Sequence, residues 1–261
     1  MANTSTIDGT LASLASGLLS GQIHVVDCSA PLGPSTPLEA MGPAPADQQP
    51  AVEIHKISEY DEDGPFFAWN WLKVSEHAGT HFDAPSAAGG QLSDHGSTDT
   101  LNPQTLAAPV CVIDVKSQCT EDPGYLLTPA DVQAWEQTHG DIPPGSWVVM
   151  HSGWAARADD PDIYLNNGIH PGPDGDCMRY LIGKGIVGFG SECVATDAGQ
   201  AATMDPPYPA RQLLHEANLF GLASLINLDR LPPKGAVLIA APLKFVNGTG
   251  SPTRAMALVP A

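Results

Sequence analysis

Short apolar runs recur along the sequence between polar segments, and this pattern predicts an α/β fold. Each run has the length of a strand, is rich in β-branched residues and is bounded by turn residues. The predicted strands are His24–Cys28, Val110–Val115, Trp147–His151, Ile186–Gly190 and Ala236–Ala240. No segment repeats at a fixed period and no linker divides the chain, so we expect a single domain over residues 1–261.

Helix signals lie between these strands. Thr128 can cap a helix whose first position is Pro129, and this segment then continues to about His139. The other predicted helices are residues 174–183, residues 211–218 and an N-terminal extension within residues 1–21. Loops are predicted where Pro, Gly and acidic residues gather, over residues 33–50 and 120–125.

The composition is typical of a soluble enzyme, with 43% apolar residues. A net charge of −18 with only 11 Lys and Arg argues against nucleic acid and against a membrane as partners, because both are bound through basic patches. The apolar stretch within residues 11–19 follows no basic segment and is too short to span a bilayer, so we expect a cytoplasmic protein. The five cysteines lack paired short spacing and predict reduced thiols.

Residues 75–85 (SEHAGTHFDAP) combine two imidazoles and a carboxylate, which are ligand types for a divalent transition metal. In a straight strand His77 and His81 would stand about 13 Å apart, too far to share one ion. A bend at Gly79-Thr80 would fold His77 back, while His81 and Asp83 would point to the same side of an extended segment. This arrangement predicts a catalytic metal with open positions; the alternative is a turn with two hydrogen-bonded histidines.

The segment His77–Pro85 resembles the HxGTHxDxP signature of the cyclase family, which includes bacterial kynurenine formamidases and isatin hydrolases. Three more segments are similar to that family: residues 27–36 (DCSAPLGPST), 64–70 (GPFFAWN) and 240–252 (AAPLKFVNGTGSP). The resemblance implies an α/β fold of the single-domain swivelling β/β/α type with a mixed central sheet. It also implies a homodimer or homotetramer that uses manganese or zinc to hydrolyse amide-like bonds in small molecules.

The sequence departs from the family pattern just after the motif, where Ala87 stands in place of the usual histidine. In dinuclear members that histidine helps to hold a second metal together with a late glutamate, and the aligned segment 223–227 offers no carboxylate. The resemblance therefore implies one Mn²⁺ or Zn²⁺ per chain, held by His77, His81 and Asp83. It leaves the acid or base open. His95 is one candidate replacement, with a position in a surface loop as the alternative.

Three further residues are candidates for proton transfer. Glu192 follows a predicted strand, where α/β proteins often place functional side chains, and it could act as a base or orient a metal ligand. The alternative is an acid that caps a turn. His170 precedes a Pro-Gly-Pro loop and His215 lies on a predicted helix; for both, a buried and hydrogen-bonded histidine is the alternative. Asp197, in a position where relatives also carry an aspartate, could simply hold its loop.

Aromatic residues are scarce, at 6%, but cluster just before the metal motif. In an extended chain Phe67, Trp69 and Trp71 would face the same way and could wall a pocket for a flat substrate. Trp154 is a further candidate for the rim of that pocket, and for all these rings a place in the core is the alternative. The predicted partner is therefore a small cyclic or aromatic molecule.

Together these patterns predict a metal-dependent hydrolase of a small-molecule amide, lactam, imide or lactone, acting through a metal-activated water. Two alternatives remain open. One is a non-hydrolytic cyclase, dehydratase or isomerase of secondary metabolism, which the absent histidine favours. The other is a ligand-binding member of the family that has lost catalysis.

Overall fold

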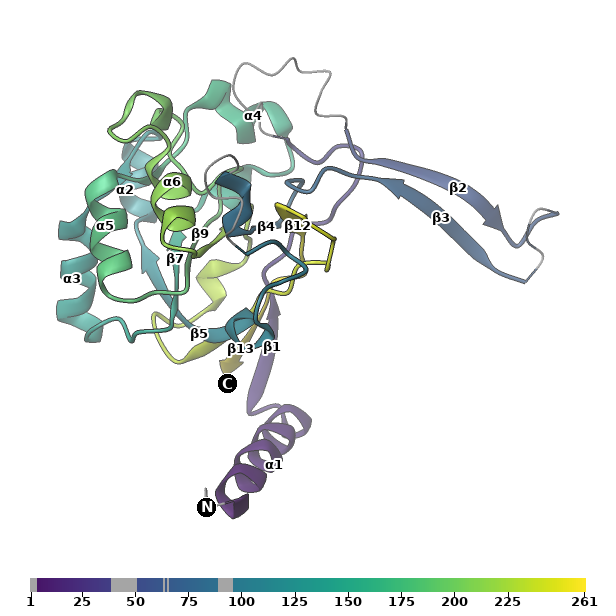
Figure 1. Ribbon diagram of the computed structural model, residues 1–261, viewed down its shortest axis with the longest axis horizontal. Helices are drawn as coiled ribbons and strands as arrows, with labels where there is room; N and C mark the ends of the chain where they lie inside the picture. Colours follow the sequence, from purple (N-terminus) through teal and green to yellow (C-terminus); the bar gives the residue numbers. More distant parts are fainter. Residues whose placement is uncertain (1–3, 39–50, 63, 65, 89–95) are drawn as a thin grey trace.

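The computed structural model describes residues 4–38, 51–62, 64, 66–88 and 96–261, with only the backbone described over residues 4–8. A curled nine-stranded sheet forms its centre, in the order β1-β13-β11-β5-β7-β9-β10-β4-β12 (Figure 1). The strands of this sheet are β1 (Ile23–Asp27), β4 (His81–Asp83), β5 (Ala107–Asp114), β7 (Trp147–His151), β9 (Gly188–Ser191), β10 (Phe220–Ala223), β11 (Ala236–Ile239), β12 (Gly250–Pro252) and β13 (Met256–Pro260).

The sheet is mixed, as the family resemblance implies. The pairs β5–β7, β7–β9 and β9–β10 are parallel, whereas β4 runs antiparallel to both β10 and β12. Strands β1, β13, β11 and β5 also pair in antiparallel fashion. The α/β fold predicted from the sequence is therefore confirmed.

Six α-helices lie in the described part of the chain: α1 (Thr4–Ser20), α2 (Lys116–Glu121), α3 (Pro129–His139), α4 (Pro161–Leu165), α5 (Gly175–Gly183) and α6 (Pro209–Glu216). Helix α3 begins where the sequence predicts, because Thr128 and Asp131 form a reciprocal capping box. The predicted loop at 120–125 is partly wrong, since α2 continues to Glu121. None of the described helices has the length and apolar character needed to cross a membrane.

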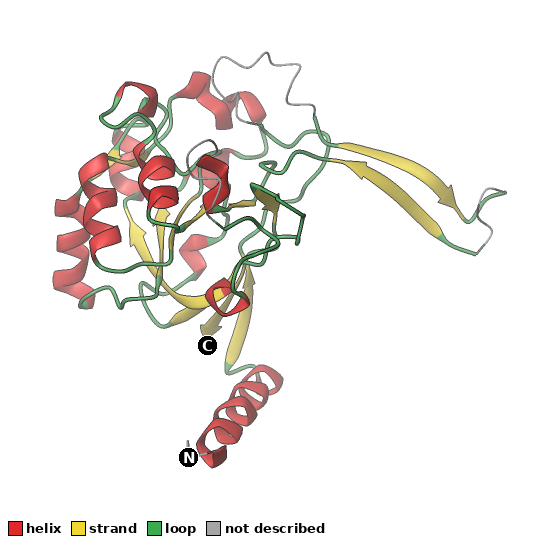
Figure 2. Cartoon of the chain, in the orientation of Figure 1, coloured by secondary structure: helices red, strands yellow, loops and turns green. Residues whose placement is uncertain are grey.

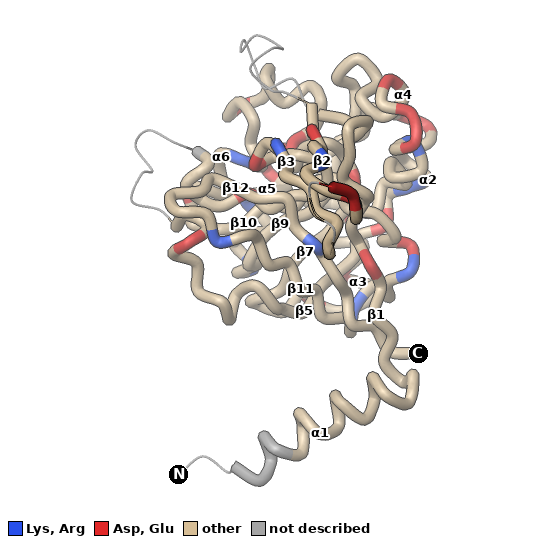
Figure 3. The backbone as a smooth tube through the Cα atoms, turned by 90° about the vertical axis from the view of Figure 1, so that its right-hand side faces the viewer, with Lys and Arg blue, Asp and Glu red and all other residues tan. Residues whose placement is uncertain are grey.

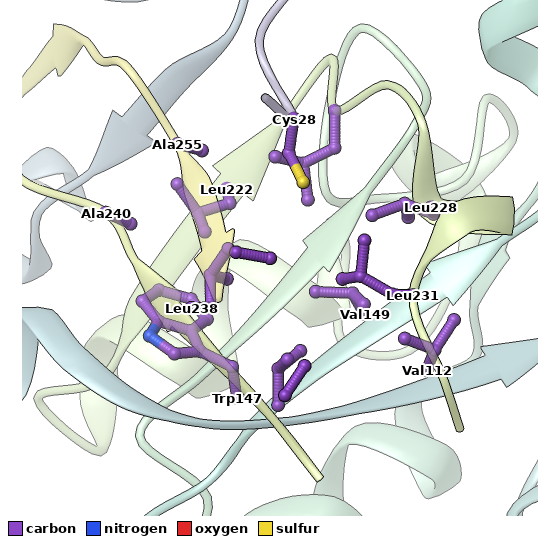
Figure 4. Packing of buried hydrophobic residues seen from close by; sticks show 14 of the residues in the cluster. Cys28, Val112, Trp147, Val149, Leu222, Leu228, Leu231, Leu238, Ala240 and Ala255 are labelled. Atoms are coloured by element: carbon purple, nitrogen blue, oxygen red, sulfur yellow. The ribbon is translucent and has the colours of Figure 1, made fainter. Parts of the chain in front are cut away.

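Alternate residues of the central strands face two different hydrophobic clusters. In β5, Val110 and Val112 join one cluster while Cys111 and Ile113 join the other. Helices α3, α5 and α6 cover the second face and contribute buried side chains such as Leu181 to it (Figure 2). The first cluster is filled by residues of the strands and loops, among them Trp147 and Leu222 (Figure 4). The sheet is thus buried on both faces. Functional side chains can therefore reach solvent at the ends of its strands rather than on its faces.

A two-stranded hairpin projects from this body (Figure 1). It consists of β2 (Glu53–Glu59) and β3 (Ala68–Lys73), which form a two-stranded sheet separate from the central one. We refer to residues 53–73 as the arm. Every residue of β3 is exposed, including Trp69 and Trp71, which leave 52% and 50% of their surface accessible. Helix α1 also extends away from the body, beside β1.

The basic residues are few and the cysteines are unpaired, as the composition and cysteine spacing predict. Lys and Arg are few and scattered along the chain (Figure 3), in keeping with 11 basic against 29 acidic residues. All five cysteines are unpaired and buried. Burial raises the pKa of the Cys28 thiol to about 12 and that of Cys111 to about 11. These thiols are protonated at neutral pH.

Candidate active site

The predicted metal ligands meet at one end of the short strand β4. His81 and Asp83 are buried on this strand, and His77 is brought back to them by a turn in which Gly79 has a φ of +60°. His77 Nδ1 lies 2.6 Å from Asp83 Oδ1, and His81 Nε2 lies 3.5 Å from the same oxygen. The ligand atoms of all three residues fall within 4.8 Å of one another, so a single ion can reach them all.

The donor set fits a metal ion. Asp83 Oδ2 is buried and has no hydrogen-bond partner among the described residues, which is costly for a carboxylate oxygen unless a cation satisfies it. His81 Nδ1 is 2.7 Å from the carbonyl oxygen of Gly79 and donates a hydrogen bond to it. The other nitrogen, Nε2, is then left with a lone pair directed at the cluster. Two imidazoles and one carboxylate leave coordination positions open, as catalytic sites do.

Electrostatics prepare these groups for a cation. Burial alone would raise the pKa of Asp83, but the neighbouring His81 and the hydrogen bond with His77 hold that pKa well below its usual range. Burial lowers the pKa of His81 below its ordinary value. Burial acts the same way on His77, but the hydrogen bond and the charge of Asp83 outweigh it and raise the pKa of His77. Asp83 is thus ionised and His81 neutral at neutral pH.

A row of polar residues lies beside this cluster, at the carboxyl edge of the parallel strands. Asp114 and His151 end the neighbouring strands β5 and β7, with 3.3 Å between His151 Nδ1 and Asp114 Oδ1. Glu192 directly follows β9, and Ser224 directly follows β10. Functional side chains of α/β proteins gather at such an edge because the carboxyl ends of parallel strands meet there.

Glu192 is held firmly at this edge. Its Oε2 accepts hydrogen bonds from the backbone nitrogen and hydroxyl of Ser152, at 2.8 and 3.0 Å, and from the backbone nitrogen of Trp154, at 3.1 Å. Burial raises the pKa of Glu192, although the charge of His151 and the bonds from Ser152 oppose that effect. A buried carboxyl with a raised pKa is suited to giving and taking protons.

Two cavities meet at Glu192. One, of about 220 Å³, is lined by Gly79 of the metal-binding turn and by Tyr164, Glu192 and Ser224. The other, of about 350 Å³, is also lined by Glu192 and extends to His151 and Lys116. The hydroxyl of Tyr164 lies 3.1 Å from Ser224 Oγ and donates to the carbonyl of Glu192 at 2.7 Å. Glu192 therefore lies on the wall of a space that reaches the turn between His77 and His81.

The other predicted proton carriers lie elsewhere. His170 and His215 are both buried, on the loop before β8 (Gly172–Pro173) and on α6, and neither lines these two cavities. His95 lies outside the described residues. Asp197 caps α6 by accepting from the backbone nitrogens of Ala210 and Arg211 at 2.7 and 3.2 Å. Asp197 thereby ties its loop to the start of α6.

The predicted pocket aromatics are not brought to the metal cluster within one chain. Phe67, Trp69 and Trp71 belong to the arm and its tip, which project away from the body (Figure 1). Trp154 does not lie at a rim either: it is buried, and its Nε1 donates to the carbonyl of Tyr164 at 2.9 Å.

Three residues that line the cavities were not predicted from the sequence: His151, Tyr164 and Ser224. His151 could have been found, because it ends a predicted strand, and the rule that singled out Glu192 applies equally there. Tyr164 and Ser224 gave no such signal. Tyr164 lies on the short helix α4, and Ser224 follows β10, a strand that the sequence did not predict.

The chain matches known proteins over nearly its full length. The Cyclase family model, described as "Putative cyclase", matches residues 26–198. An isatin hydrolase from Roseibium aggregatum is 57% identical over 96% of this chain and 97% of that protein. A kynurenine formamidase from Salinibacter ruber is 27% identical over 89% and 96%. The crystal structure of an isatin hydrolase bound to the product analogue thioisatinate superposes with a TM-score of 0.91 at 53% identity, covering 97% of this chain and 99% of that one.

Proposed function

Because the chain belongs to the cyclase family of metal-dependent hydrolases, we propose that it opens the lactam ring of isatin or of a close analogue. Hydrolysis of the ring C–N bond adds water and leaves an aromatic amine and a carboxylate on one product. The observation that carries the proposal is the cluster of His77, His81 and Asp83, with a buried Asp83 oxygen that no described residue satisfies. The similar proteins are hydrolases, and this chain has a candidate metal site. Both observations favour hydrolysis over the non-hydrolytic and non-catalytic alternatives.

We propose one ion per chain at this cluster, Mn²⁺ or Zn²⁺, because nitrogen and carboxylate ligands suit both metals. Bound there, the ion would polarise the substrate carbonyl and make a water molecule more acidic. His77, His81 and Asp83 would hold the ion. Ala87, in a short 3₁₀ helix over Pro85–Ala88, has no ligand atom to offer a second ion.

Glu192 is the proton carrier that the geometry favours. Its raised pKa and its place on the cavity shared with Gly79 allow it to hold a proton near the reacting bond. Ser152 and the backbone of Trp154 fix one carboxyl oxygen and leave the other for the cavity. His170, His215 and His95 are the remaining candidates, and the pH dependence of kcat in single variants of each distinguishes them from Glu192.

We propose a homodimer in which the arm of each chain lies against its partner, with a homotetramer as a pair of such dimers. An isolated two-stranded hairpin is marginally stable in water, and this one exposes Phe67, Trp69 and Trp71. Contact with a second copy would bury these rings. The aromatic wall expected from the sequence would then be supplied across the interface, against a flat substrate.

We also propose that the protein works in the cytoplasm. Its five cysteines are all unpaired, which suits a compartment that keeps thiols reduced.

Isatin opening in H₂¹⁸O tests the function. We expect about one Mn or Zn per chain by mass spectrometry of metals, and one ¹⁸O in the carboxylate product. His81→Ala should lose both the metal and the activity. A metal-loaded protein that leaves isatin and related lactams unchanged would contradict the proposal.

A further inference from the structure

A chain of hydrogen bonds leads away from the cluster through the ring nitrogen of His77 that does not face Asp83. His77 Nδ1 faces Asp83, and His77 Nε2 lies 3.0 Å from the hydroxyl oxygen of Thr249. That hydroxyl lies 2.5 Å from Glu76 Oε2, which also accepts from the backbone nitrogen of Thr249 at 3.2 Å. Glu76 precedes His77 directly in sequence, whereas Thr249 comes from the far end of the chain.

The chemistry of these groups determines which of them donates and which accepts in each hydrogen bond. An ionised carboxylate only accepts hydrogen bonds, so the single hydroxyl proton of Thr249 goes to Glu76. The hydroxyl oxygen is then left to accept from His77, which keeps a proton on Nε2. In the structure as it stands Nδ1 also carries a proton, which it donates to Asp83 at 2.6 Å. Once that proton is lost, the fixed Nε2 proton leaves a neutral His77 with a bare Nδ1 toward the cluster. The opposite tautomer, with the proton on Nδ1, would donate to Asp83 and could not bind a metal through that atom.

The backbone around Thr249 is shaped to bring it close to His77. β12 pairs with β4 so that Gly250 lies opposite Asp83, and the carbonyl of Thr249 accepts from the backbone nitrogen of Ala84 at 2.9 Å. A Cβ at Gly250 would stand 2.6 Å from His77 Cε1 and 2.7 Å from the carbonyl oxygen of Phe82. Only glycine permits this approach.

We propose that Glu76 and Thr249 are positioning residues that select the metal-binding tautomer of His77. The inference rests on the metal site proposed above and extends it to two residues outside the proposed ligand set of His77, His81 and Asp83. Residues that orient metal-bound histidines change metal affinity by roughly 10- to 100-fold when they are replaced.

Metal affinity of the metal-free full-length protein tests this role. Zn²⁺ is titrated at fixed pH in competition with a chelating dye, for wild type, Glu76→Gln, Thr249→Val and Thr249→Ser. We expect Glu76→Gln and Thr249→Val to weaken binding by roughly 10- to 100-fold. Thr249→Ser keeps the hydroxyl and should bind like wild type. Thr105→Val is the matched control, since among the described residues the hydroxyl of Thr105 bonds locally, to the carbonyl of Asn102.

A second readout reports the tautomer itself. In Zn²⁺-loaded protein with ¹⁵N-labelled histidine, two-bond ¹H–¹⁵N spectra should show His77 protonated on Nε2 in the wild type and in Thr249→Ser. We expect that signal to be lost or to exchange in Glu76→Gln, an isosteric variant that preserves packing.

The outcomes separate this inference from the metal site itself. If His81→Ala also binds Zn²⁺ like wild type, the proposed metal site is wrong. If His81→Ala loses binding while Glu76→Gln and Thr249→Val stay within twofold of wild type, the positioning role is overturned and the metal site stands. Weaker binding in Thr249→Ser as well as Thr249→Val would likewise overturn it, because the loss would not follow the hydroxyl.

Discussion

The metal edge and the arm are neighbours in sequence but opposites in structure. The metal edge, which we define as residues 75–83 with β12, buries His81 and Asp83 and packs glycine backbone against the ring of His77. The arm ends at Lys73, immediately before it, yet exposes every residue of β3. The metal edge is packed against other parts of the same chain, whereas the arm makes few such contacts.

This difference shows what each region depends on. In the metal edge the buried oxygen Asp83 Oδ2 has no hydrogen-bond partner among the described residues, and we propose that a cation satisfies it. The arm buries little of its surface: Ser58 is the one buried residue of β2, and β3 has none. Trp71 stacks on His55 with ring centroids 4.0 Å apart, but both strands remain open to solvent. We therefore expect the metal edge to respond to loss of metal and the arm to loss of a partner chain.

The largest expected effect comes from Asp83→Asn. This change keeps the size of the side chain and removes the negative ligand, so we expect the metal to be lost. Turnover of isatin should fall by roughly 10³-fold or more, because a catalytic metal supplies several kcal/mol of transition-state stabilisation. Metal analysis and steady-state kinetics measure both effects. Asp61→Asn at the end of the arm is the control, and a similar loss there would break the contrast between the regions.

The next effect concerns the arm. Trp69→Ser with Trp71→Ser should leave metal content unchanged and dissociate the proposed dimer. Central interface tryptophans cost roughly 2 kcal/mol or more when truncated, so each change should weaken association about 30-fold. Sedimentation velocity over a range of concentrations measures this. Val25→Ser on β1, an exposed apolar residue of the body, should not alter it. A double variant that dimerises like wild type would show that the arm has another role.

The part of the site that the sequence predicts is local. His77, His81 and Asp83 lie within one bend, so period-two alternation and a glycine turn were enough to place them together. The strands Trp147–His151 and Ala236–Ala240 were recognisable because both are apolar and β-branched, and the structure has them within one residue of the predicted bounds. Thr128 also identified the start of α3 correctly.

What the sequence does not predict depends on pairing between distant segments. Thr249 reaches His77 only because β12 pairs with β4, and β12 (GSP) carries no strand signal. The arm was also missed, since Trp69 and Trp71 have the alternation of a half-buried strand and give no sign that the covering surface lies outside the body. Long-range register and the partner of an exposed face are not encoded in any short window.

The close packing of the metal edge predicts a stability effect at Gly250. Gly250→Ala would force a Cβ against His77 and the backbone of Phe82, and we expect a loss of roughly 1–3 kcal/mol in the free energy of unfolding. Urea unfolding of the metal-free protein measures it. Gly33→Ala is the matched control, because a Cβ there would meet no atom within 4 Å. Equal stability of the two variants would mean that the metal edge yields as readily as an open turn.

The smallest expected effect is on the pH dependence of stability, and it compares the buried carboxyl of Glu192 with the exposed carboxyl of Glu53. Burial raises the pKa of Glu192, so the folded protein holds that proton more tightly than the unfolded chain does. Its stabilising contribution is therefore complete below the ordinary value near 4.5 and is lost as the pH rises through the raised value. Glu192→Gln should flatten this decline, by about 1.4 kcal/mol for every tenfold difference in proton affinity between the folded and unfolded chain.

On the arm, Glu53 differs in sign: hydrogen bonds from Lys73 and His55 lower its pKa. Any contribution it makes is present above its ordinary pKa and is lost as the pH falls through the lowered value. Solvent screens this exposed group, so Glu53→Gln should leave the pH dependence of unfolding close to wild type. Urea unfolding of the metal-free variants between pH 4 and 8 compares them. If Glu53→Gln flattened the curve as much as Glu192→Gln, burial at the carboxyl edge would not be what sets this protein's pH dependence.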